Sequence, residues 1–230
     1  MSGVLYLVGT PVGNLKDITL RALETLKAVD LIVCEDTRQT TKLLRHYEIR
    51  KPTASLHEHN ERSRAPELLE KLKAGRSIAL VCDGGTPLIN DPGWWLVHRA
   101  IEERLPVQWI PGATALIGAL VLSGLPIDRF VFEGFLPAKP GARRKRLEAL
   151  KAEEKTIVLY ESPHRLLKTL ADIRDVLGEI PMSCARELTK LFEEIRRGSV
   201  SEVMTHFSQH PPRGEFVLVF NPQSEIPNPQ

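Results

Sequence analysis

The amino-acid sequence predicts an α/β protein of two domains, and two observations carry that prediction. In the first half of the chain, short apolar runs typical of buried strands alternate with amphipathic stretches typical of helices. This alternation favours a mostly parallel sheet with right-handed crossovers. After the Ser-Gly-Leu-Pro stretch at residues 123–126 the composition shifts, and the runs that follow favour a mixed sheet. We therefore expect one domain over residues 1–122 and a second over residues 123–222.

The first domain contains predicted strands at residues 4–8, 31–34, 53–56, 78–81 and 107–110. Between them, helices are predicted over residues 19–28, 37–46, 65–74 and 94–103. Leu20, Leu23 and Leu26 recur at the spacing of a buried helix face, and Gly75 ends the third helix.

The second domain contains predicted strands at residues 130–132, 156–160, 182–186 and 216–220, with helices over residues 143–152 and 164–177. The short spacing from Leu191 to Arg197, turned at Gly198, indicates an antiparallel portion of this sheet. The proline-rich tail at residues 223–230 is expected to be disordered.

A long glycine-rich loop follows the fourth predicted strand. Gly84 and Gly85 let a ligand approach the backbone closely, because neither residue carries a Cβ. Pro87 and Pro92 stiffen the loop, and Asp83 lies at the carboxyl end of the strand, where open α/β sheets bind their ligands. A plain strand-to-helix connection needs only a few residues, so we interpret this segment as a preformed binding loop.

Two more loops of this kind follow predicted strands, at residues 9–15 and 111–115. The first lacks the Gly-Lys-Ser/Thr ending of a Walker motif and the Gly-x-Gly-x-x-Gly fingerprint, which argues against a nucleoside triphosphate or NAD site. Taken alone, each loop also fits a turn that joins two elements, and Gly118 and Ala119 also fit a helix pressed against a sheet. Their recurrence at strand ends in one domain favours a binding site.

Six segments, in this order along the chain, resemble the tetrapyrrole methylase superfamily. They are Leu-Val-Gly-Thr-Pro-Val-Gly-Asn-Leu at 7–15, Cys-Glu-Asp-Thr-Arg at 34–38, Leu-His-Glu-His-Asn-Glu at 56–61, Asp-Gly-Gly-Thr-Pro-Leu-Ile at 83–89, Tyr-Glu-Ser-Pro-His-Arg at 160–165 and Ala-Arg-Glu-Leu-Thr-Lys at 185–190. Each segment is weak alone, but together they cover nearly the whole chain. They are most similar to the branch that methylates a ribose 2′-hydroxyl on a cytidine of 16S ribosomal RNA.

That resemblance implies S-adenosylmethionine as the cofactor, bound in a cleft between the two α/β domains. It implies contacts from the loops of the first domain and from a smaller set in the second, namely Thr10, Pro11, Val12, Asp83, Gly84, Gly85, Ile89, Thr114, Ala115, Glu161, Arg186 and Leu188. Asp83 either pairs with the ammonium group of the cofactor or shapes the loop.

Methyl transfer to a ribose requires alignment of the reacting atoms and removal of a proton from a weakly acidic hydroxyl, but no metal. The candidate bases are His57 and Glu58 in a His-Glu-His segment, and Asp36. Histidine suits proton transfer near neutral pH, although the segment also fits a polar loop with structural or solvated histidines. Asp36 also fits a role at a helix N-terminus. Two imidazoles without a third ligand argue against a metal site.

Basic residues near the expected cleft suggest an RNA substrate, whose phosphates need positioning. The candidates are the run Arg143, Arg144, Lys145 and Arg146 and, more weakly, Arg38, Lys42, Arg165 and Lys190. A cationic run of this kind also fits a solvated helix face. The ribosomal RNA branch often carries a further small helical domain at the carboxyl end, which is missing here. Either the sequence is trimmed, or substrate capture relies on the two core domains or a dimer.

The composition is ordinary for a globular protein, and the cysteines indicate a reducing compartment. A net charge of +2 permits a nucleic-acid partner without indicating one. Cys34, Cys82 and Cys184 are scattered, and the chain shows no leader segment and no apolar run that could span a bilayer. We expect a cytoplasmic homodimer that acts on 16S ribosomal RNA or the small subunit, without a membrane or a metal.

Two other functions stay compatible with the sequence. One is a methyltransferase of the same fold that acts on a tetrapyrrole, another small molecule or a protein. The basic run and the His57 segment favour an RNA substrate over these. The other is a non-catalytic RNA-binding assembly factor, against which the intact glycine-rich loops argue.

Overall fold

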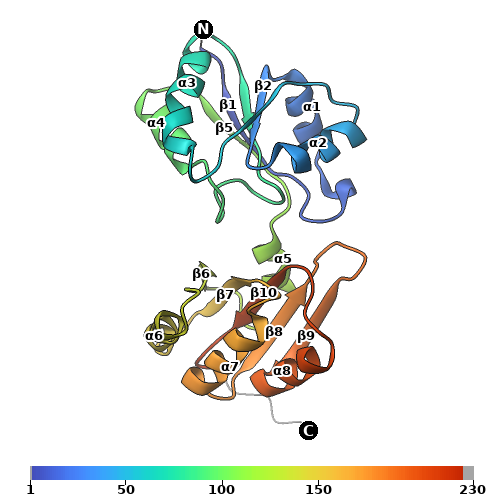
Figure 1. Ribbon diagram of the computed structural model, residues 1–230, viewed down its shortest axis with the longest axis vertical. Helices are drawn as coiled ribbons and strands as arrows, with labels where there is room; N and C mark the ends of the chain where they lie inside the picture. Colours follow the sequence, from blue (N-terminus) through green and yellow to red (C-terminus); the bar gives the residue numbers. More distant parts are fainter. Residues whose placement is uncertain (1, 225–230) are drawn as a thin grey trace. The chain divides into compact units, whose positions relative to one another are not determined.

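The computed structural model describes residues 2–224 (Figure 1). The chain divides into two compact units, one ending at Thr114 and the other beginning at Ala115. The boundary expected between residues 122 and 123 lies beyond this division, because helix α5 (Ala115–Leu122) packs on the second sheet. Of the tail for which we expect disorder, residues 225–230 lie outside the described part of the chain. Gln223 is held by its side chain, which donates to the Lys151 carbonyl over 2.7 Å.

The first unit is built on a five-stranded parallel sheet, which confirms the predicted parallel arrangement. Its strand order is β3-β2-β4-β1-β5. The strands are β1 (Leu5–Val8), β2 (Leu31–Cys34), β3 (Thr53–Ser55), β4 (Ile78–Leu80) and β5 (Val107–Ile110). The helices are α1 (Leu20–Ala28), α2 (Thr37–His46), α3 (Glu61–Lys73) and α4 (Trp94–Glu102), with a short 3-10 helix, η1 (Leu15–Asp17), before α1.

Helices cover both faces of this sheet (Figure 1). On one face α3 and α4 bury Leu72 and Leu96 against β1 and β4. On the other face α1 and α2 bury Leu26 and Leu44 against Ile32 of β2. Strands covered on both faces tend to be apolar along their whole length, as β1, β2 and β4 are, whereas β3 and β5 at the ends of the strand order contain polar residues.

Polar side chains cap the two helices that begin beside the loops. The Thr19 hydroxyl accepts from the backbone N–H of Ala22 over 3.1 Å at the start of α1. Asp36 does the same for α2, where its carboxylate accepts from the backbone N–H of Arg38 over 2.8 Å. By contrast, α3 begins at Glu61, earlier than the predicted residue 65, and runs through a proline in its second turn.

The second unit is a mixed five-stranded sheet, as predicted. Its order is β6-β7-β10-β8-β9, in which β6 and β7 are parallel and the other neighbours antiparallel. The strands are β6 (Phe130–Phe135), β7 (Thr156–Glu161), β8 (Pro181–Arg186), β9 (Glu194–Ser199) and β10 (Phe216–Phe220). The helices after α5 are α6 (Pro140–Leu150), α7 (Leu166–Leu177) and α8 (Val200–Gln209).

Two details of this unit differ from the sequence prediction. The antiparallel pair β8 and β9 is present, but the chain turns before β9, and Gly198 lies within that strand. Helix α8 has no counterpart among the predicted helices. Its signal is a capping box, in which the Ser199 hydroxyl accepts from the Glu202 N–H and the Glu202 carboxylate accepts from the Ser199 N–H over 2.7 Å.

The second sheet is also covered on both faces. Helices α6, α7 and α8 pack on one face around a core in which Phe207 and Phe216 meet edge to face at 5.4 Å. Helix α5 lies on the other face, where Leu116 and Leu120 pack with Val158 of β7. This contact is the reason that α5 belongs to the second unit.

Candidate functional site

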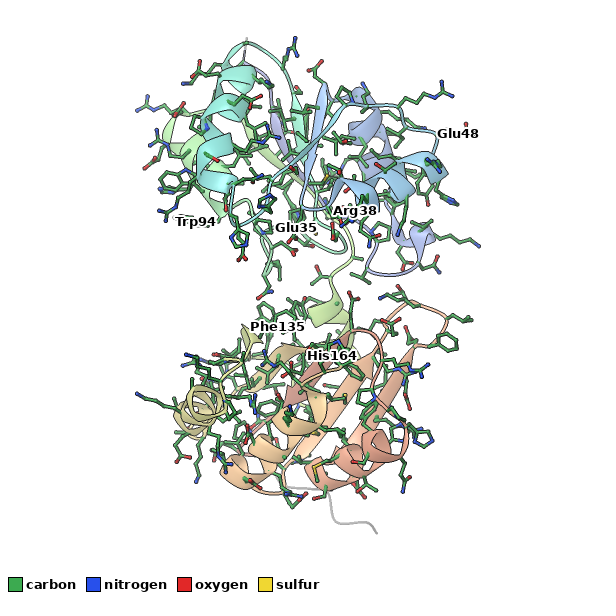
Figure 2. All side chains as sticks on the ribbon, viewed as in Figure 1. Glu35, Arg38, Glu48, Trp94, Phe135 and His164 are labelled. Carbon is green, nitrogen blue, oxygen red and sulfur yellow. The ribbon has the colours of Figure 1, made fainter. Side chains whose placement is uncertain are left out.

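The carboxyl ends of the parallel strands of the first unit lie at one edge of its sheet, the edge at which such sheets bind ligands. Polar residues and glycines follow every strand there: Gly9 and Thr10 after β1, Glu35 and Asp36 after β2, His57 after β3, Asp83 to Gly85 after β4, and Gly112 to Thr114 after β5. Figure 2 places Glu35 and Arg38 at this end of the unit.

Hydrogen bonds join the three predicted loops into one structure. The backbone N–H of Thr10 donates to the Gly85 carbonyl over 2.8 Å, and that of Gly85 donates to the Thr10 carbonyl over 3.0 Å. The Thr10 hydroxyl also donates to the Cys82 carbonyl over 3.2 Å. The hydroxyl oxygens of Thr86 and Thr114 lie 2.6 Å apart. The loops after β1, β4 and β5 are therefore fixed relative to one another.

Gly9 and Gly112 bring the first and third loops into backbone contact. A Cβ on Gly9 would lie 2.7 Å from the Cα of Gly112, and a Cβ on Gly112 would lie 2.8 Å from the Cα of Gly9. Real Cβ atoms do not approach a backbone so closely, so both positions require glycine for packing.

Gly84 and Gly85 lie close against the first loop. A Cβ on Gly84 would lie 3.1 Å from the Pro11 carbonyl oxygen. A Cβ on Gly85 would lie 3.5 Å from Cγ1 of Val12 and 3.8 Å from the Ala113 carbonyl oxygen. Gly85 also has a φ of +107°, which side-chain-bearing residues rarely adopt. A Cβ at Gly85 would therefore contact Val12 and Ala113, and its absence leaves the backbone of Gly85 bare, which suits close approach of a ligand.

The loop after β4 is held in a strained shape. Leu88 and Asn90 have φ values of +73° and +66°, in the left-handed region. Such residues cost about 1–3 kcal/mol each and persist where packing imposes them, often at ligand-binding loops. Leu88 packs against the core of the first unit, whereas Ile89 between the two strained residues is 37% exposed.

Asp36 is occupied as a helix cap and as the partner of Arg38. Its carboxylate accepts from the Nε and Nη2 atoms of Arg38 over 3.1 and 2.8 Å. Hydrogen bonds from the side chain and backbone of Arg38 lower the pKa of Asp36 to about 2. A carboxylate with so low a pKa is a poor proton acceptor near neutral pH, so we withdraw Asp36 as a candidate base.

Asp91 is a candidate that the sequence analysis missed. Burial raises its pKa to about 6 against the effect of a hydrogen bond with the Cys82 thiol, and the charges of Glu35 and Asp83 raise it further. Burial also raises the pKa of Glu35, and the charges of Asp83 and Glu58 act in the same direction. A carboxyl with a pKa near 6 suits proton transfer. The spacing of residues carries no sign of this burial, which arises only in the folded unit.

His57 is the partly enclosed member of the His-Glu-His segment. Its backbone N–H donates to Oδ1 of Asn60 over 2.8 Å. Its Nδ1 is buried and has no hydrogen-bond partner among residues 2–224. Glu58 and His59 are exposed, and their side chains lie 3.3 Å apart. Of the two histidines, His57 therefore has the more enclosed ring.

In the second unit, the residues that the resemblance implies as cofactor contacts are engaged with their own neighbours. Glu161 is buried and accepts from the Thr169 hydroxyl over 2.5 Å. Arg186 forms an ion pair with Glu194 at 3.3 Å. Leu188 is buried and packs with the residues of α5. These side chains stabilise the second unit by itself.

The basic run at the start of α6 is largely neutralised. Arg143 is only 3% exposed, and its guanidinium pairs with the Asp172 carboxylate at 2.6 Å. Arg144 pairs with the same carboxylate at 3.3 Å, and Arg146 pairs with Glu133 at 2.6 Å. Because the charge of Arg143 is buried and paired, we withdraw this residue as a phosphate contact.

The other predicted cations of the second unit differ in their pairing. Lys145 is exposed and forms no ion pair within residues 2–224. Arg165 lies 3.3 Å from the Glu161 carboxylate, and Lys190 lies 2.9 Å from that of Glu187. Of these three cations, Lys145 is therefore the one whose charge stands unpaired.

Three findings concern the described part of the chain as a whole. No helix within residues 2–224 has both the length and the apolar character needed to cross a membrane. No group of three or more histidine, cysteine, aspartate or glutamate side chains in that range could hold a metal ion. The three cysteines are buried free thiols.

Comparisons with known proteins place the chain among methyltransferases. A family model described as Tetrapyrrole (Corrin/Porphyrin) Methylases matches residues 4–204. A curated relative from Synechocystis sp., named Ribosomal RNA small subunit methyltransferase I, is 55% identical over 94% of this chain and 78% of its own length. A relative of the same name from Thermotoga maritima is 48% identical over 95% of this chain and 98% of its own length.

Solved structures share the fold at much lower identity. A diphthine synthase has a TM-score of 0.74 at 15% identity, covering 95% of this chain and 90% of its own. A cobalt precorrin-4 methyltransferase has a TM-score of 0.72 at 16% identity, covering 95% and 94%. At such low identity the likeness concerns the fold alone, and it confirms the predicted fold class.

Proposed function

The chain belongs to the tetrapyrrole (corrin/porphyrin) methylase family, and we propose that it is an S-adenosylmethionine-dependent methyltransferase of small-subunit ribosomal RNA. We further propose that the methyl acceptor is the ribose 2′-hydroxyl of a cytidine in 16S ribosomal RNA. Such a substrate locates the activity in the cytoplasm. The observation that carries the proposal is the joined set of glycine loops after β1, β4 and β5.

These loops fit the cofactor through their backbone. When bound, S-adenosylmethionine supplies a methyl group made electrophilic by its sulfonium. The bare backbone of Gly84 and Gly85, the side chain of Val12 and the carbonyl of Ala113 border the space in which it would be held. Because the loops are joined by hydrogen bonds, this surface is formed before any ligand arrives, and little ordering entropy is lost on binding.

The proton of the ribose hydroxyl must leave as the new bond forms, and the first unit offers two acceptors. The Asp91 carboxyl, with a pKa of about 6, is mostly ionised at neutral pH and can take a proton. The His57 ring is the other acceptor, and its Nδ1 lacks a partner among residues 2–224. We assign proton removal to one of these two groups, and Glu58, which is exposed, to a supporting role.

The RNA substrate is favoured over a tetrapyrrole or a protein by the degree of similarity. The relatives named for ribosomal RNA methylation are 55% and 48% identical to the chain. The solved structures named for other substrates are 15% and 16% identical and support the fold only.

Calorimetric titration with S-adenosylmethionine, with ATP and NAD as controls, tests the cofactor. Transfer of a labelled methyl group to isolated small ribosomal subunits, to naked 16S ribosomal RNA and to a uroporphyrinogen then tests the substrate. We expect binding of S-adenosylmethionine alone and label in the ribosomal samples. If S-adenosylmethionine binds and the methyl group is transferred to the uroporphyrinogen, the substrate is a tetrapyrrole and not RNA. If the chain binds RNA but not S-adenosylmethionine, the protein is a non-catalytic RNA-binding assembly factor.

A further inference from the structure

The exposed side of α2 carries a hollow of about 630 Å³ that the glycine loops do not explain. Most of its lining comes from one helix and is cationic or hydroxyl-bearing: Thr37, Arg38, Thr41, Lys42, Arg45 and His46. Leu15 of η1 completes the lining. We call this hollow the α2 groove.

The permanent cations of the α2 groove lie on one face of the helix. Arg38, Lys42 and Arg45 are separated by four and three residues, the spacing that stacks side chains along an α-helix. At a rise of 1.5 Å per residue they extend over about 10 Å of the helix axis. The opposite face holds the buried Leu43 and Leu44. The stripe of charge is therefore held toward solvent by the packing of α2 on its sheet.

Carboxylates leave most of this charge available. Arg38 pairs with Asp36 at 2.8 Å, but its side chain remains 87% exposed. Lys42 donates to the neutral side chain of Gln39 over 2.8 Å. Neither Lys42 nor Arg45 forms an ion pair with any carboxylate of residues 2–224.

The basic surface continues past the end of α2. A second hollow, of about 720 Å³, also includes Arg45 and is lined further by Arg50 and Lys51, with Glu48 as an acidic member. Figure 2 labels Glu48 at the end of α2 remote from Arg38. Cations therefore outnumber acids along the whole length of this surface.

We propose that the α2 groove binds the phosphodiester backbone of the RNA substrate. The proposal rests on the proposed function and adds the place where the RNA is held. Exposed lysines and arginines in a row neutralise phosphates without regard to sequence, and such contacts fix the position of a strand. The lining contains no aromatic platform for base stacking other than the His46 ring, which favours backbone contact over base recognition.

The α2 groove leads to the candidate site because α2 starts at that site. The backbone N–H of Asp36 donates to Oδ1 of Asp83 over 3.2 Å, which ties the start of the helix to the loop after β4. Leu15 is the last residue of the first glycine loop, and the Tyr47 hydroxyl donates to the Leu15 carbonyl over 2.6 Å. An RNA strand bound in the α2 groove would therefore lead toward the glycine loops.

The basic run of α6 is the competing surface. Arg144 and Arg146 are half-exposed but paired with Asp172 and Glu133. A phosphate that approaches them must displace a carboxylate or tolerate it as a like-charged neighbour, and like charges placed together are unfavourable. Of Arg143 to Arg146 only Lys145 is exposed and unpaired among residues 2–224, whereas the α2 groove contains two such cations, Lys42 and Arg45, so we assign the principal contact to α2.

Two double variants of the whole chain that lose the same charge test this assignment. Lys42→Ala with Arg45→Ala removes the unpaired cations of the α2 groove. Lys27→Ala with Arg76→Ala is the matched control, because both residues are exposed and precede β2 and β4, at the opposite edge of the same sheet. The probe is a fluorescein-labelled single-stranded fragment of 16S ribosomal RNA, whose affinity is measured by anisotropy over a range of salt. Thermal unfolding verifies that each variant is folded.

The salt dependence carries the prediction. Each phosphate contact contributes about 0.7 to the slope of log affinity against log salt for a single strand, so loss of two contacts lowers the slope by about 1.4. From about 50 to about 200 mM salt, the unmodified chain then loses about sevenfold more affinity than the groove variant. We expect the control variant to keep the unmodified slope. Equal losses in both variants, or an unchanged slope in the groove variant, would overturn the proposal.

Methyl transfer by the unmodified chain separates this proposal from the proposed function. If the chain methylates small subunits while the groove variant keeps full RNA affinity, the proposed function stands and only the proposal that the α2 groove binds RNA is wrong. If the chain neither binds nor methylates RNA, the proposed function fails and the assignment of the α2 groove fails with it.

Discussion

The backbone N–H of Asp36 donates a hydrogen bond to Oδ1 of Asp83 over 3.2 Å. This bond links the residue that caps α2 to the residue that opens the glycine loop after β4. This hydrogen bond thus connects the proposed cofactor site to the proposed RNA groove within the first unit. Substitutions can still be chosen that change the loops and leave α2 intact, as the following predictions do.

Gly85→Val should abolish binding of S-adenosylmethionine, because its side chain would enter the space between Val12 and Ala113. A β-branched residue at a φ of +107° is also strained, so the free energy of unfolding should fall by about 1–3 kcal/mol. Calorimetric titration and urea unfolding measure the two effects. Gly141→Val is the control, since a Cβ at Gly141 meets nothing within 4 Å. Full cofactor affinity in the Gly85 variant would remove the proposed site.

Thr86 and Thr114 should be energetically coupled, because their hydroxyl oxygens lie 2.6 Å apart. Thr86→Val and Thr114→Val, alone and combined, form a double-mutant cycle whose coupling energy should be about 1 kcal/mol in urea unfolding. The control cycle pairs Thr86→Val with Thr25→Val, since the Thr25 hydroxyl bonds within α1 to the Arg21 carbonyl. That second cycle should be additive within about 0.5 kcal/mol. Equal coupling in both cycles would mean that the two loops are not joined through these hydroxyls.

Asp91 should make stability depend on pH. With its pKa raised to about 6 from 3.8, the folded protein keeps a proton on this carboxyl where the unfolded chain has released it. This contribution to stability is therefore fully present below about pH 4 and is lost as pH rises through about 6. Asp91→Asn stays neutral and escapes the loss.

Thermal unfolding at several pH values checks this expectation. The melting temperature of Asp91→Asn minus that of the unmodified chain should increase from pH 4 to pH 7 and then level off. Asp17→Asn, which removes an exposed carboxylate in η1, should show a nearly constant difference. A difference for Asp91→Asn that is flat across this range would contradict the raised pKa.

Arg143→Ala should act on stability more than on RNA binding. The substitution leaves the Asp172 carboxylate, whose side chain is 10% exposed, without its nearest partner. Breaking a buried pair costs about 3–5 kcal/mol, and we expect the lower end because Arg144 still lies 3.3 Å from Asp172. Lys145→Ala, two residues on and exposed, should leave the free energy of unfolding within about 0.5 kcal/mol. Equal effects of the two substitutions in urea unfolding would refute the structural role of Arg143.

Most of the fold can be predicted from the sequence because its elements have local signals. Strands β1, β2 and β4 of the first unit are apolar runs, and each of the five strands is placed within one residue at either end. Helix α8 has a signal as well, the capping box of Ser199 and Glu202, which periodicity alone does not reveal. The domain boundary depends instead on the contact of α5 with the second sheet, and that contact is not local.

The candidate site divides in the same way. The glycine loops can be found from the sequence because glycines and prolines at strand ends mark them. Whether a charged side chain is paired cannot be found from the sequence, because its partner can be distant in the sequence. Asp172, which neutralises Arg143, lies twenty-nine positions away. The burial of Asp91 and the exposure of Arg45 in the α2 groove likewise follow from packing. A run of cations in the sequence therefore indicated α6, where Arg144 and Arg146 are paired with carboxylates. Lys42 and Arg45 of α2 form no ion pair within residues 2–224, and the sequence does not show this difference.

Alkaline hydrolysis of small-subunit RNA after methylation with methyl-labelled S-adenosylmethionine tests whether the chain methylates a ribose 2′-hydroxyl of a cytidine. A methyl group on a ribose 2′-oxygen blocks hydrolysis of the adjacent phosphodiester, so the position of the label reports the atom that was modified. We expect the label in an alkali-resistant dinucleotide that begins with cytidine. Label released in mononucleotides, or no label although S-adenosylmethionine binds, would contradict it.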